Sequence, residues 1–449
     1  MKKYDVIIVG AGPAGLFAAY KLAGNGKVLI LEKGKDIEKR VCKNYEYKYC
    51  LECRPCNIIS GVGGAGLFSD GKLNFDYRIG SNLEEIISKE DAMRMTEETE
   101  KVFSRYGIHA DELDLEKCKE LETKAYKSGV RFLPIRQAHV GSDKLPEIIK
   151  KLRDDVKARG VEIKCNEEFV DLNDKKEVIT DKGRYGYGNL LLALGRDGAR
   201  KLEQLCKEKK IDYSYQAVDM GFRIEAPALI MQELCTVVHD PKIYVPIGDE
   251  KVRTFCVCPE GFVVREQHED YCLVNGHSRK DKKSQNTNFA FLLSKRLKPI
   301  KNTNAFARKI AEVITHSGDG KPILQSLGDF RLRRRSTWER LERLKDYIQP
   351  TLKDVTPGSI GLALGYEIVV PLIAALEKLD GFIPSIAGDP TLVYSFETKL
   401  NGLRIKTNDK LETSEKSIYV AGDVSGISRG ITASAASGLL AAEGILKNK

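Results

Sequence analysis

Residues 4–34 read YDVIIVGAGPAGLFAAYKLAGNGKVLILEKG, and this stretch decides the fold of the chain. Four apolar residues lead into the glycine turn GAGPAG, a helical pattern follows, and a second apolar strand ends on Glu32. In such a turn Gly10 permits the tight bend, Gly12 lets the backbone approach a pyrophosphate, and Gly15 lets the helix pack closely on the strand. The stretch therefore predicts a strand–turn–helix–strand unit that binds a dinucleotide.

The helix after this turn provides favourable electrostatics for phosphate groups. Pro13 and Ala14 open the helix, whose first N–H groups have no intrahelical partner and lie at the positive end of the helix dipole. Glu32, followed by Lys33, stands at the tip of the second strand, where a carboxylate can accept hydrogen bonds from an adenosine ribose. We expect all four residues to bind the cofactor.

Length and composition indicate an enzyme with more than one domain. A chain of 449 residues can form two or three domains with large cores. The net charge of +9 is too diffuse to indicate a nucleic acid partner, and no apolar run approaches the length of a membrane span. The short apolar stretch after Lys2 and Lys3 does not resemble a secretory signal. Eleven cysteines, an odd number, suit a reducing compartment, so we expect a cytoplasmic protein.

The pattern along the chain predicts a first domain that a second one interrupts. Residues 1–200 form the N-terminal part of the dinucleotide-binding domain, with a charged helical insertion at about 81–125. Residues 201–398 change in character and are predicted to form an α+β substrate domain. Residues 399–449 return to the pattern of a nucleotide-binding fold and are expected to complete the first domain.

The C-terminal segment favours a flavin over a nicotinamide cofactor. A short apolar strand ends in Gly422-Asp423, and an Ala- and Ser-rich helix then opens at Gly430, Ile431 and Thr432. This segment resembles the C-terminal signature of FAD proteins of the glutathione-reductase-like and related two-dinucleotide-fold families. The resemblance implies that Asp423 binds the ribityl chain. It also implies that the N–H groups at the start of the helix stabilise negative charge at the pyrimidine edge of the flavin.

A further segment in the middle of the first domain supports the same cofactor. The strand that ends at Ala193 and Gly195 resembles the second FAD-contacting strand of those families, and Val170 on an earlier short strand is expected to contact the cofactor as well. The fold class that follows is α/β. It comprises a Rossmann-type FAD-binding domain of the two-dinucleotide-fold superfamily and an inserted α+β substrate domain.

A glycine-rich loop narrows the resemblance. Residues 61–73 read GVGGAGLFSDGKL and follow Cys53-Arg54-Pro55-Cys56. This segment resembles the hallmark loop of a bacterial and archaeal family whose members are described as FAD-dependent dehydrogenases of unknown substrate. Residues 254–259 and 274–278 resemble the middle domain of the same family. The resemblance implies FAD and redox chemistry without supplying a reaction.

The loop also has a direct physical interpretation. Its glycines give a backbone that can lie flat against a planar ring or form an anion-binding nest. Lys72 could stabilise reduced flavin or a substrate oxyanion, and Asp70 could orient Lys72 or move a proton, so both are candidate catalytic residues. The alternative is that Ser69, Asp70 and Lys72 only bind FAD. The loop residues expected to contact the cofactor are Gly63, Gly64, Ala65, Gly66 and Ser69.

Four cysteines precede this loop. Cys50, Cys53 and Cys56 have the spacing that iron–sulfur and zinc sites use, and Cys42 could supply a fourth ligand. We interpret them as ordinary reduced cysteines and predict no metal site, while a metal or cluster site and a redox-active thiol pair remain alternatives. Cys56 is retained as a third candidate catalytic residue.

A second pair of cysteines lies in the predicted substrate domain. Cys256 and Cys258 are a poor disulfide candidate on a regular strand, because side chains two residues apart share a face and a bridge between them is strained. We expect them to line the substrate pocket instead.

The sequence therefore predicts an FAD-dependent oxidoreductase. We expect it to pass a hydride or electrons between the flavin and a small organic substrate, with reduction of an activated C=C bond as the first choice of reaction. The reductant is NAD(P)H bound transiently, or ferredoxin. The alternatives are a redox relay that uses the Cys42–Cys56 cluster and an RNA-modifying flavoprotein that uses the basic segment 279–309. We expect neither a membrane nor a nucleic acid as partner.

Overall fold

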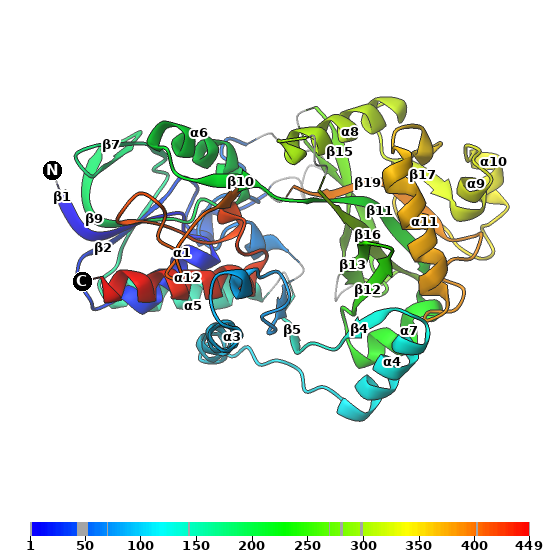
Figure 1. Ribbon diagram of the computed structural model, residues 1–449, viewed down its shortest axis with the longest axis horizontal. Coiled ribbons are helices and arrows are strands. Elements are labelled where there is room, and N and C mark those ends of the chain that lie inside the picture. Colours follow the sequence, from blue (N-terminus) through cyan, green and yellow to red (C-terminus); the bar gives the residue numbers. More distant parts are fainter. Residues whose placement is uncertain are drawn as a thin grey trace. The chain divides into compact units, whose positions relative to one another are not determined.

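A computed structural model describes residues 2–42, 53–69, 71–141, 144–268, 270–278, 282–296, 300–400 and 403–448. The chain divides into two compact units (Figure 1). Unit 1 comprises Met1–Asp111, Arg136–Gln216 and Gly402–Lys449, and unit 2 comprises Glu112–Ile135 and Ala217–Asn401. No helix among the described residues combines the length and the apolar character needed to cross a membrane.

The sheet of unit 1 is built around parallel strands, and its central strands contain runs of buried apolar residues, as expected where a strand is covered on both faces. In spatial order these strands are β6 (Glu162–Cys165), β2 (Val28–Glu32), β1 (Lys2–Val9), β9 (Arg184–Leu192) and β21 (Ile418–Val420). The antiparallel strands β8 (Glu177–Thr180) and β7 (Phe169–Asn173) extend the sheet from β9. This mainly parallel sheet, with helices between its strands, confirms the predicted α/β fold class.

The register of these strands brings their carboxyl ends to one edge of the sheet. Val9 of β1 is paired with Leu31 of β2 and with Leu192 of β9, and Val420 of β21 is also paired with Leu192. Ligands of open α/β sheets bind beyond this edge. The predicted cofactor residues that follow these strands directly are therefore held close to one another by the sheet itself.

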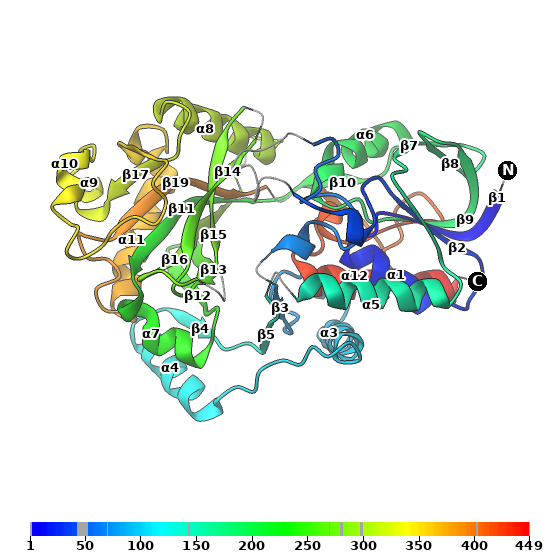
Figure 2. The ribbon, with the colours of Figure 1, turned by 180° about the vertical axis from the view of Figure 1, so that it is seen from behind.

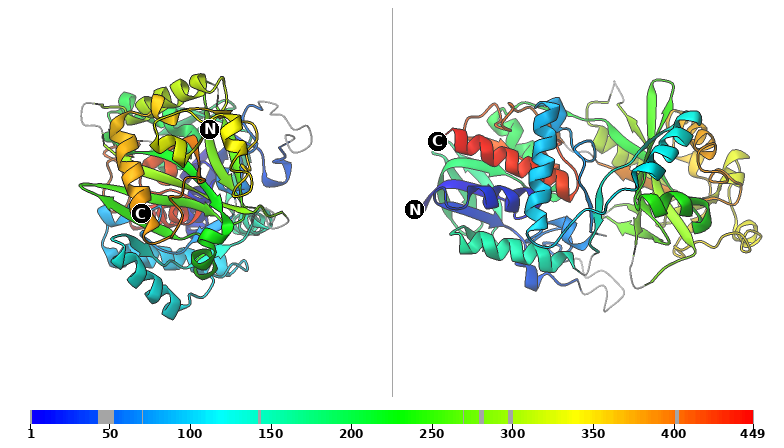
Figure 3. Two further views of the ribbon diagram at one scale, coloured as in Figure 1. Left: turned by 90° about the vertical axis from the view of Figure 1, so that its right-hand side faces the viewer. Right: turned by 90° about the horizontal axis from the view of Figure 1, so that it is seen from below.

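Two helices from opposite ends of the chain lie side by side in unit 1. α12 (Ile431–Lys447) packs along α1 (Pro13–Leu22), and α5 (Leu145–Ala158) packs on another part of α1 (Figure 3). The first carbon of a side chain at Gly438 would lie 2.1 Å from the carbonyl oxygen of Ala14, so only glycine allows this approach. Among the described residues, unit 1 also contains the following elements. They are α3 (Lys89–Ser104), α6 (Ala199–Lys209), the strand pair β3 (Lys72–Asn74) and β5 (Gln137–His139), the strand pair β10 (Tyr213–Tyr215) and β20 (Leu403–Ile405), and the short 3-10 helices η1 (Ile37–Lys39), η2 (Ala65–Phe68), η3 (Leu83–Glu85), η4 (Arg196–Gly198) and η6 (Asp423–Ser425).

Unit 2 is organised around one eight-stranded sheet (Figure 2). In spatial order its strands are β18 (Thr356–Pro357), β17 (Ile323–Ser326), β19 (Leu392–Lys399), β11 (Val218–Pro227), β16 (Asn286–Lys295), β13 (Glu250–Cys258), β12 (Lys242–Ile247) and β4 (Arg131–Leu133). A separate hairpin joins β14 (Phe262–Gln267) to β15 (Cys272–His277). The helices are α4 (Leu115–Lys127), α7 (Ala228–Val237), α8 (Thr303–Ser317), α9 (Leu327–Arg331), α10 (Trp338–Glu342) and α11 (Tyr366–Asp380), with the 3-10 helix η5 (Ile360–Leu362).

The central strand β11 shows why this sheet has two different faces. Met220, Phe222 and Ile224 belong to a core that also contains side chains of α8 and α11. The intervening residues Asp219 and Arg223 are polar and point to the opposite face, because side chains alternate along a strand. Unit 2 thus carries charged groups on the face of the sheet that its main hydrophobic core does not use.

The observed units differ from the predicted domains most clearly in the placement of residues 112–135. Residues 112–135 were predicted to belong to the first domain, within or just after its helical insertion, but they pack in unit 2. The apolar face of α4, with Cys118 and Leu121, joins the core of unit 2, and β4 adds an edge strand to its sheet. The division at 216/217 falls somewhat later in the chain than the predicted boundary at 200/201. The division at 401/402 falls close to the predicted boundary at 398/399.

Candidate functional site

The glycine turn after β1 is packed so closely that side chains are excluded at two positions. Gly10 has a φ of +106°, and the first carbon of a side chain there would lie 2.2 Å from the carbonyl oxygen of Ala193. At Gly15 the same carbon would lie 1.9 Å from the carbonyl oxygen of Gly10. Both glycines are therefore required by the approach of β1, α1 and β9, as the sequence pattern predicts.

The second glycine-rich loop lies against this first turn. The N–H of Gly63 donates to the carbonyl oxygen of Ala11 at 2.8 Å, and a side chain at Gly64 would begin 3.1 Å from the α-carbon of Gly12. At Gly66 it would begin 2.7 Å from the side chain of Ile431, at the start of α12. Three segments that are far apart in sequence, around residues 12, 64 and 431, are thereby brought together.

The carboxylate of Glu32 links the first glycine turn to the second glycine-rich loop by hydrogen bonds. Its Oε2 accepts a hydrogen bond from the N–H of Ala11 at 2.8 Å, and its Oε1 accepts from the N–H groups of Gly34 (2.8 Å) and Gly61 (2.9 Å). The side chain is only 6% exposed. A carboxylate has about four lone-pair positions, so this bridging leaves capacity for the predicted ribose hydrogen bond, which remains a prediction.

Arg40 is the residue that sequence reasoning missed. It is buried, and among the described residues its guanidinium donates to main-chain carbonyl groups of the second loop and of the residues just before it. Burial lowers the pKa of this guanidinium to about 10, and the nearby Glu32 carboxylate opposes that effect. Its neighbourhood, EKRVCK, reads like any solvated run of charge, so no signal in the sequence identifies it. The acceptors are the carbonyl oxygens of Asn57 (3.0 Å), Ile58 (2.8 Å), Gly61 (3.3 Å), Val62 (2.7 Å) and Gly64 (2.9 Å).

The C-terminal candidate residues meet the same edge of the sheet. Asp423 begins η6, shortly after the end of β21, and is half-buried, and its Oδ1 accepts a hydrogen bond from the Ser434 hydroxyl at 2.9 Å. Gly422 packs toward Ala14, where a side chain would begin 3.1 Å from the Ala14 β-carbon. Ile431 and Thr432, in the first turn of α12, are both buried.

These residues fit an FAD molecule on two grounds. In the part of the chain that the structure describes, no side chain caps the N-terminus of α1 at Gly12 or that of α12 at Gly430, so both positive helix ends can receive an anionic group. The surroundings of Gly12 and Gly430 also leave room for a ligand. Apart from the adjoining main chain, no described heavy atom lies within 4 Å of the position that the first side-chain carbon would take at Gly430, and at Gly12 the nearest such atom, on Gly64, is 3.8 Å away.

The structure describes Ser69 and Lys72 of the loop, but not Asp70. The Ser69 hydroxyl donates to the carbonyl oxygen of Gly66 at 2.7 Å and so closes the loop. Lys72 begins β3, is half-buried and is paired in register with His139 of β5. Asp70 lies outside the described residues. The chemical roles proposed for Lys72 and Asp70 therefore remain predictions.

Three further cofactor predictions lie around the ends of β2, β7 and β9. Lys33 forms an ion pair with Asp197. Val170 is 41% exposed and lies in β7 where the register with β8 shifts. At Gly195 nothing lies within 4 Å of the position that a side chain would take. Their contacts with FAD, like that of Ala65 in η2, remain predictions.

The cysteine cluster is described only in part, because Cys50 lies outside the described residues. Cys42, Cys53 and Cys56 are not in disulfides. Among the residues that the structure describes, no three His, Cys, Asp or Glu side chains come together as a metal site would require. The metal and relay alternatives thus gain no support from the described part of the cluster.

Comparisons with known protein families match both units. Residues 5–39 match a family described as "FAD binding domain", and residues 241–400 match one described as "FAD-dependent protein, C-terminal domain-like". An uncharacterized protein of Clostridium beijerinckii is 27% identical over 488 residues, which cover 98% of this chain and 80% of the relative. An uncharacterized protein of Methanosarcina barkeri is 62% identical over 34 residues, 7% of this chain and 9% of that protein.

Solved structures are similar only at a distance. Glycine oxidase from Geobacillus kaustophilus is 13% identical, with a TM-score of 0.39 over 100% of this chain and 95% of that one. L-proline dehydrogenase from P. horikoshii is 12% identical, with a TM-score of 0.41 over 100% and 94% of the two chains. Similarity at this level does not indicate a substrate.

Proposed function

We propose that this chain, which is an FAD-dependent oxidoreductase, transfers a hydride or electrons between its flavin and a small organic anion. Bound FAD supplies the two-electron redox chemistry. The residues assigned to the cofactor lie in unit 1, and a cationic surface suited to an organic anion lies in unit 2. The observation that carries the choice of an anion is a group of cations around one aromatic ring in unit 2.

Residues of unit 1 bind different parts of the FAD molecule in this proposal. The N-terminus of α1 binds the pyrophosphate, and the N-terminus of α12 binds the pyrimidine edge of the ring system. Glu32 accepts from the ribose through its remaining lone-pair capacity, and Asp423 binds the ribityl chain. Arg40 holds the second glycine loop in place and touches no reacting atom.

The proposed substrate-binding surface is centred on Phe255, which is half-buried on β13. Its ring lies 4.9 Å from the guanidinium carbon of Arg253, 5.2 Å from Nζ of Lys399 and 5.8 Å from Nζ of Lys242. A flat apolar ring among three cations suits a planar organic acid, because the ring packs against the substrate while the cations attract its charge.

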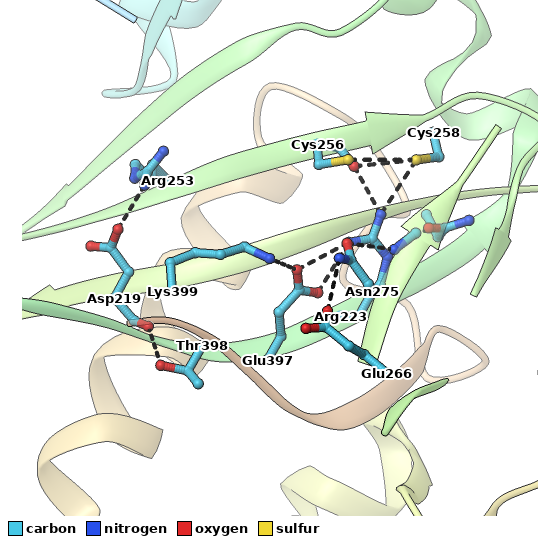
Figure 4. A network of polar contacts seen from close by, with 12 residues as sticks. Asp219, Arg223, Arg253, Cys256, Cys258, Glu266, Asn275, Glu397, Thr398 and Lys399 are labelled. Carbon is cyan, nitrogen blue, oxygen red and sulfur yellow. Dashed lines mark hydrogen bonds and ion pairs between the residues drawn. The ribbon is translucent and has the colours of Figure 1, made fainter. Parts of the chain in front are cut away.

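The charges beneath this ring do not cancel. Arg253 is paired with Asp219 at 2.7 Å, and Lys242 is paired with Asp240 at 2.5 Å. Lys399 shares Glu397 with the buried Arg223, at 2.8 Å and 3.0 Å (Figure 4). Within this group of described side chains, four cations thus share three carboxylates, an excess of one positive charge in a setting of low dielectric. An anionic substrate would balance it.

The reaction we propose is reduction of a C=C bond conjugated to a carboxylate, or the reverse dehydrogenation. The carboxylate would bind beside Lys399 and Arg253 of unit 2. The first experiment compares flavin reduction by NADH, NADPH and reduced ferredoxin in a stopped-flow instrument. If reduced ferredoxin is the sole donor and no organic acceptor reoxidises the flavin, an electron-transfer function replaces this one.

The second experiment tests the cationic surface directly. Once an unsaturated acid has been found as acceptor, Lys399→Gln should raise its KM about tenfold, because one attractive charge is lost. The rate of flavin reduction by the donor should not change. Lys309→Gln, an exposed lysine of α8, is the matched control. An equal effect of Lys399→Gln on the neutral methyl ester of the same acid would contradict the proposed role.

A further inference from the structure

The strand that carries Phe255 also carries two cysteines whose sulfur atoms approach each other. The Sγ atoms of Cys256 and Cys258 lie 3.9 Å apart (Figure 4), and neither is in a disulfide. The pairing of β13 with β16 shifts register between Phe255 and Cys258, and Cys256 has a φ of +47°. The objection to a bridge on a regular strand therefore does not apply, because this part of β13 is a bulge.

A buried cation stands beside the pair. Arg223 is fully buried, and its Nη2 donates to Sγ of Cys258 at 3.5 Å and to the carbonyl oxygen of Cys256 at 2.8 Å. Its Nη1 donates to Glu397 at 3.0 Å, and its Nε donates to Asn288 at 2.7 Å. A guanidinium held in place this way stabilises a thiolate at Cys258, which is the reactive form of the group.

The two thiols differ in access. Cys256 is half-buried, whereas Cys258 is fully buried. Redox-active thiol pairs combine these properties, since one sulfur must reach an external disulfide and the other must resolve the resulting mixed disulfide. We propose that Cys256 and Cys258 form a redox-active dithiol that exchanges with low-molecular-weight disulfides.

The exchange is balanced in atoms and electrons. The Cys256 thiolate attacks one sulfur of the external disulfide, forms a mixed disulfide with it and releases the first small thiolate. The Cys258 thiolate then attacks the Cys256 sulfur, closes the Cys256–Cys258 bond and releases the second small thiolate. The two protons of the protein thiols pass to the released thiolates. The dithiol is oxidised by two electrons, and the external disulfide is reduced to two thiols.

The sequence around the pair permits a direct measurement on the full-length protein with FAD bound. Trypsin cleaves after Arg253 and Arg265 and at no residue between them, so both cysteines fall on the single peptide 254–265. The protein is incubated with glutathione disulfide, quenched in acid, denatured, alkylated and digested. We expect this peptide to have lost two hydrogens and to carry no alkyl group.

Other cysteines serve as internal controls in the same digest. Burial raises the pKa of the Cys206 thiol to about 12 and also raises the pKa of the Cys272 thiol, so both should be alkylated only after denaturation. Their peptides should therefore carry the alkyl group in the treated and untreated samples alike. The proposal is overturned if peptide 254–265 still carries two alkyl groups after equilibration with excess glutathione disulfide.

Two variants separate the roles of the thiols. Cys258→Ser should trap one glutathione on Cys256, because no resolving thiol remains. Cys256→Ser should show no glutathione, because Cys258 is buried. Cys272→Ser should leave oxidation of peptide 254–265 unchanged. Glutathione on Cys258 in the Cys256→Ser protein, at the level found on Cys256 in the Cys258→Ser protein, would contradict the assigned order of attack.

Discussion

Arg40 shows how a single side chain can organise a flexible loop. Glycine-rich segments lose much conformational entropy on folding, so a loop such as 61–66 needs strong contacts to hold one shape. Here one guanidinium supplies hydrogen bonds to carbonyl groups on both sides of the loop's first turn. The packing of loop 61–66 on the turn at Gly12 thus depends on a residue that lies outside every motif.

We expect Arg40→Met to weaken FAD binding at least tenfold and to lower the free energy of unfolding by about 3 kcal/mol. Methionine keeps much of the side-chain volume but leaves several buried carbonyl oxygens without a donor. Fluorescence titration of the apoprotein with FAD and urea unfolding measure the two effects. Lys39→Met, at the exposed neighbouring position, is the control. Unchanged FAD affinity in the Arg40 variant would show that the loop keeps its shape without it.

At the residue scale, the sequence predicts the glycines well and the buried polar contacts poorly. Gly10 and Gly15 are predicted because no side chain fits where a strand, a turn and a helix meet, and this geometry recurs among dinucleotide-binding turns. The bridging by Glu32 and the contacts of Arg40 are hydrogen bonds to main-chain groups. Such bonds place no constraint on the side chains of their partners, so they leave no pattern to find.

At the scale of elements, α12 is the clearest example of what long-range contacts add. The sequence predicts a helix after Gly430, and the structure shows which contacts attach this helix to the other helices of unit 1. Glu443 of α12 accepts hydrogen bonds from Arg94 of α3 at 2.9 Å and 3.1 Å and from Lys21 of α1 at 3.3 Å. No local pattern of charge predicts partners that lie more than 300 residues away in sequence, as Arg94 does.

This group of charges makes stability depend on pH. Burial by itself raises the pKa of Glu443, but hydrogen bonds and charges from Arg94 and Lys21 outweigh it, so the pKa is lowered on folding. A lowered carboxyl pKa means that the native state binds fewer protons than the unfolded one. The stabilisation is therefore complete above the unfolded pKa of about 4.3 and is lost as the pH falls through the folded value.

We expect Glu443→Gln to lower the free energy of unfolding by about 1 kcal/mol at pH 7, with a smaller difference from the native sequence at pH 3.5. Urea unfolding at the two pH values provides the measurement. Glu84→Gln, at an exposed position of unit 1, should change neither value. A difference for Glu443→Gln that stays the same at both pH values would argue against the ion-pair origin of the effect.

At the scale of the whole molecule, each unit has its own hydrophobic core, although the chain passes between the units four times. The two-part first domain is predictable, because a strand and a Gly-Asp turn near the C-terminus repeat the character of the first 200 residues. The transfer of residues 112–135 to unit 2 is not predictable. Apolar positions such as Cys118 and Leu121 mark the buried face of α4 but do not indicate which core covers it.

The separate cores lead to an expectation for cofactor binding. At a free FAD concentration 100 times its Kd, a ligand that binds the folded form stabilises it by about 2.7 kcal/mol. Core amides of β1, β9 and α12 should then exchange hydrogen about 100-fold more slowly, while core amides of β11 and β16 should not change. Hydrogen exchange with mass spectrometry on the apoprotein, with and without FAD, measures both sets. Equal slowing in the two sets would show that the units unfold together.

The position of β21 and α12 at the end of unit 1 has a consequence for biosynthesis. A ribosome makes β9 and α1 long before the elements that cover them, because residues 418–447 are translated after the whole of unit 2. Until then the nascent polypeptide exposes an unpaired strand edge and the apolar side of α1, which are typical targets for chaperones. Premature termination anywhere before residue 418 would therefore yield a product destined for degradation rather than for flavin loading.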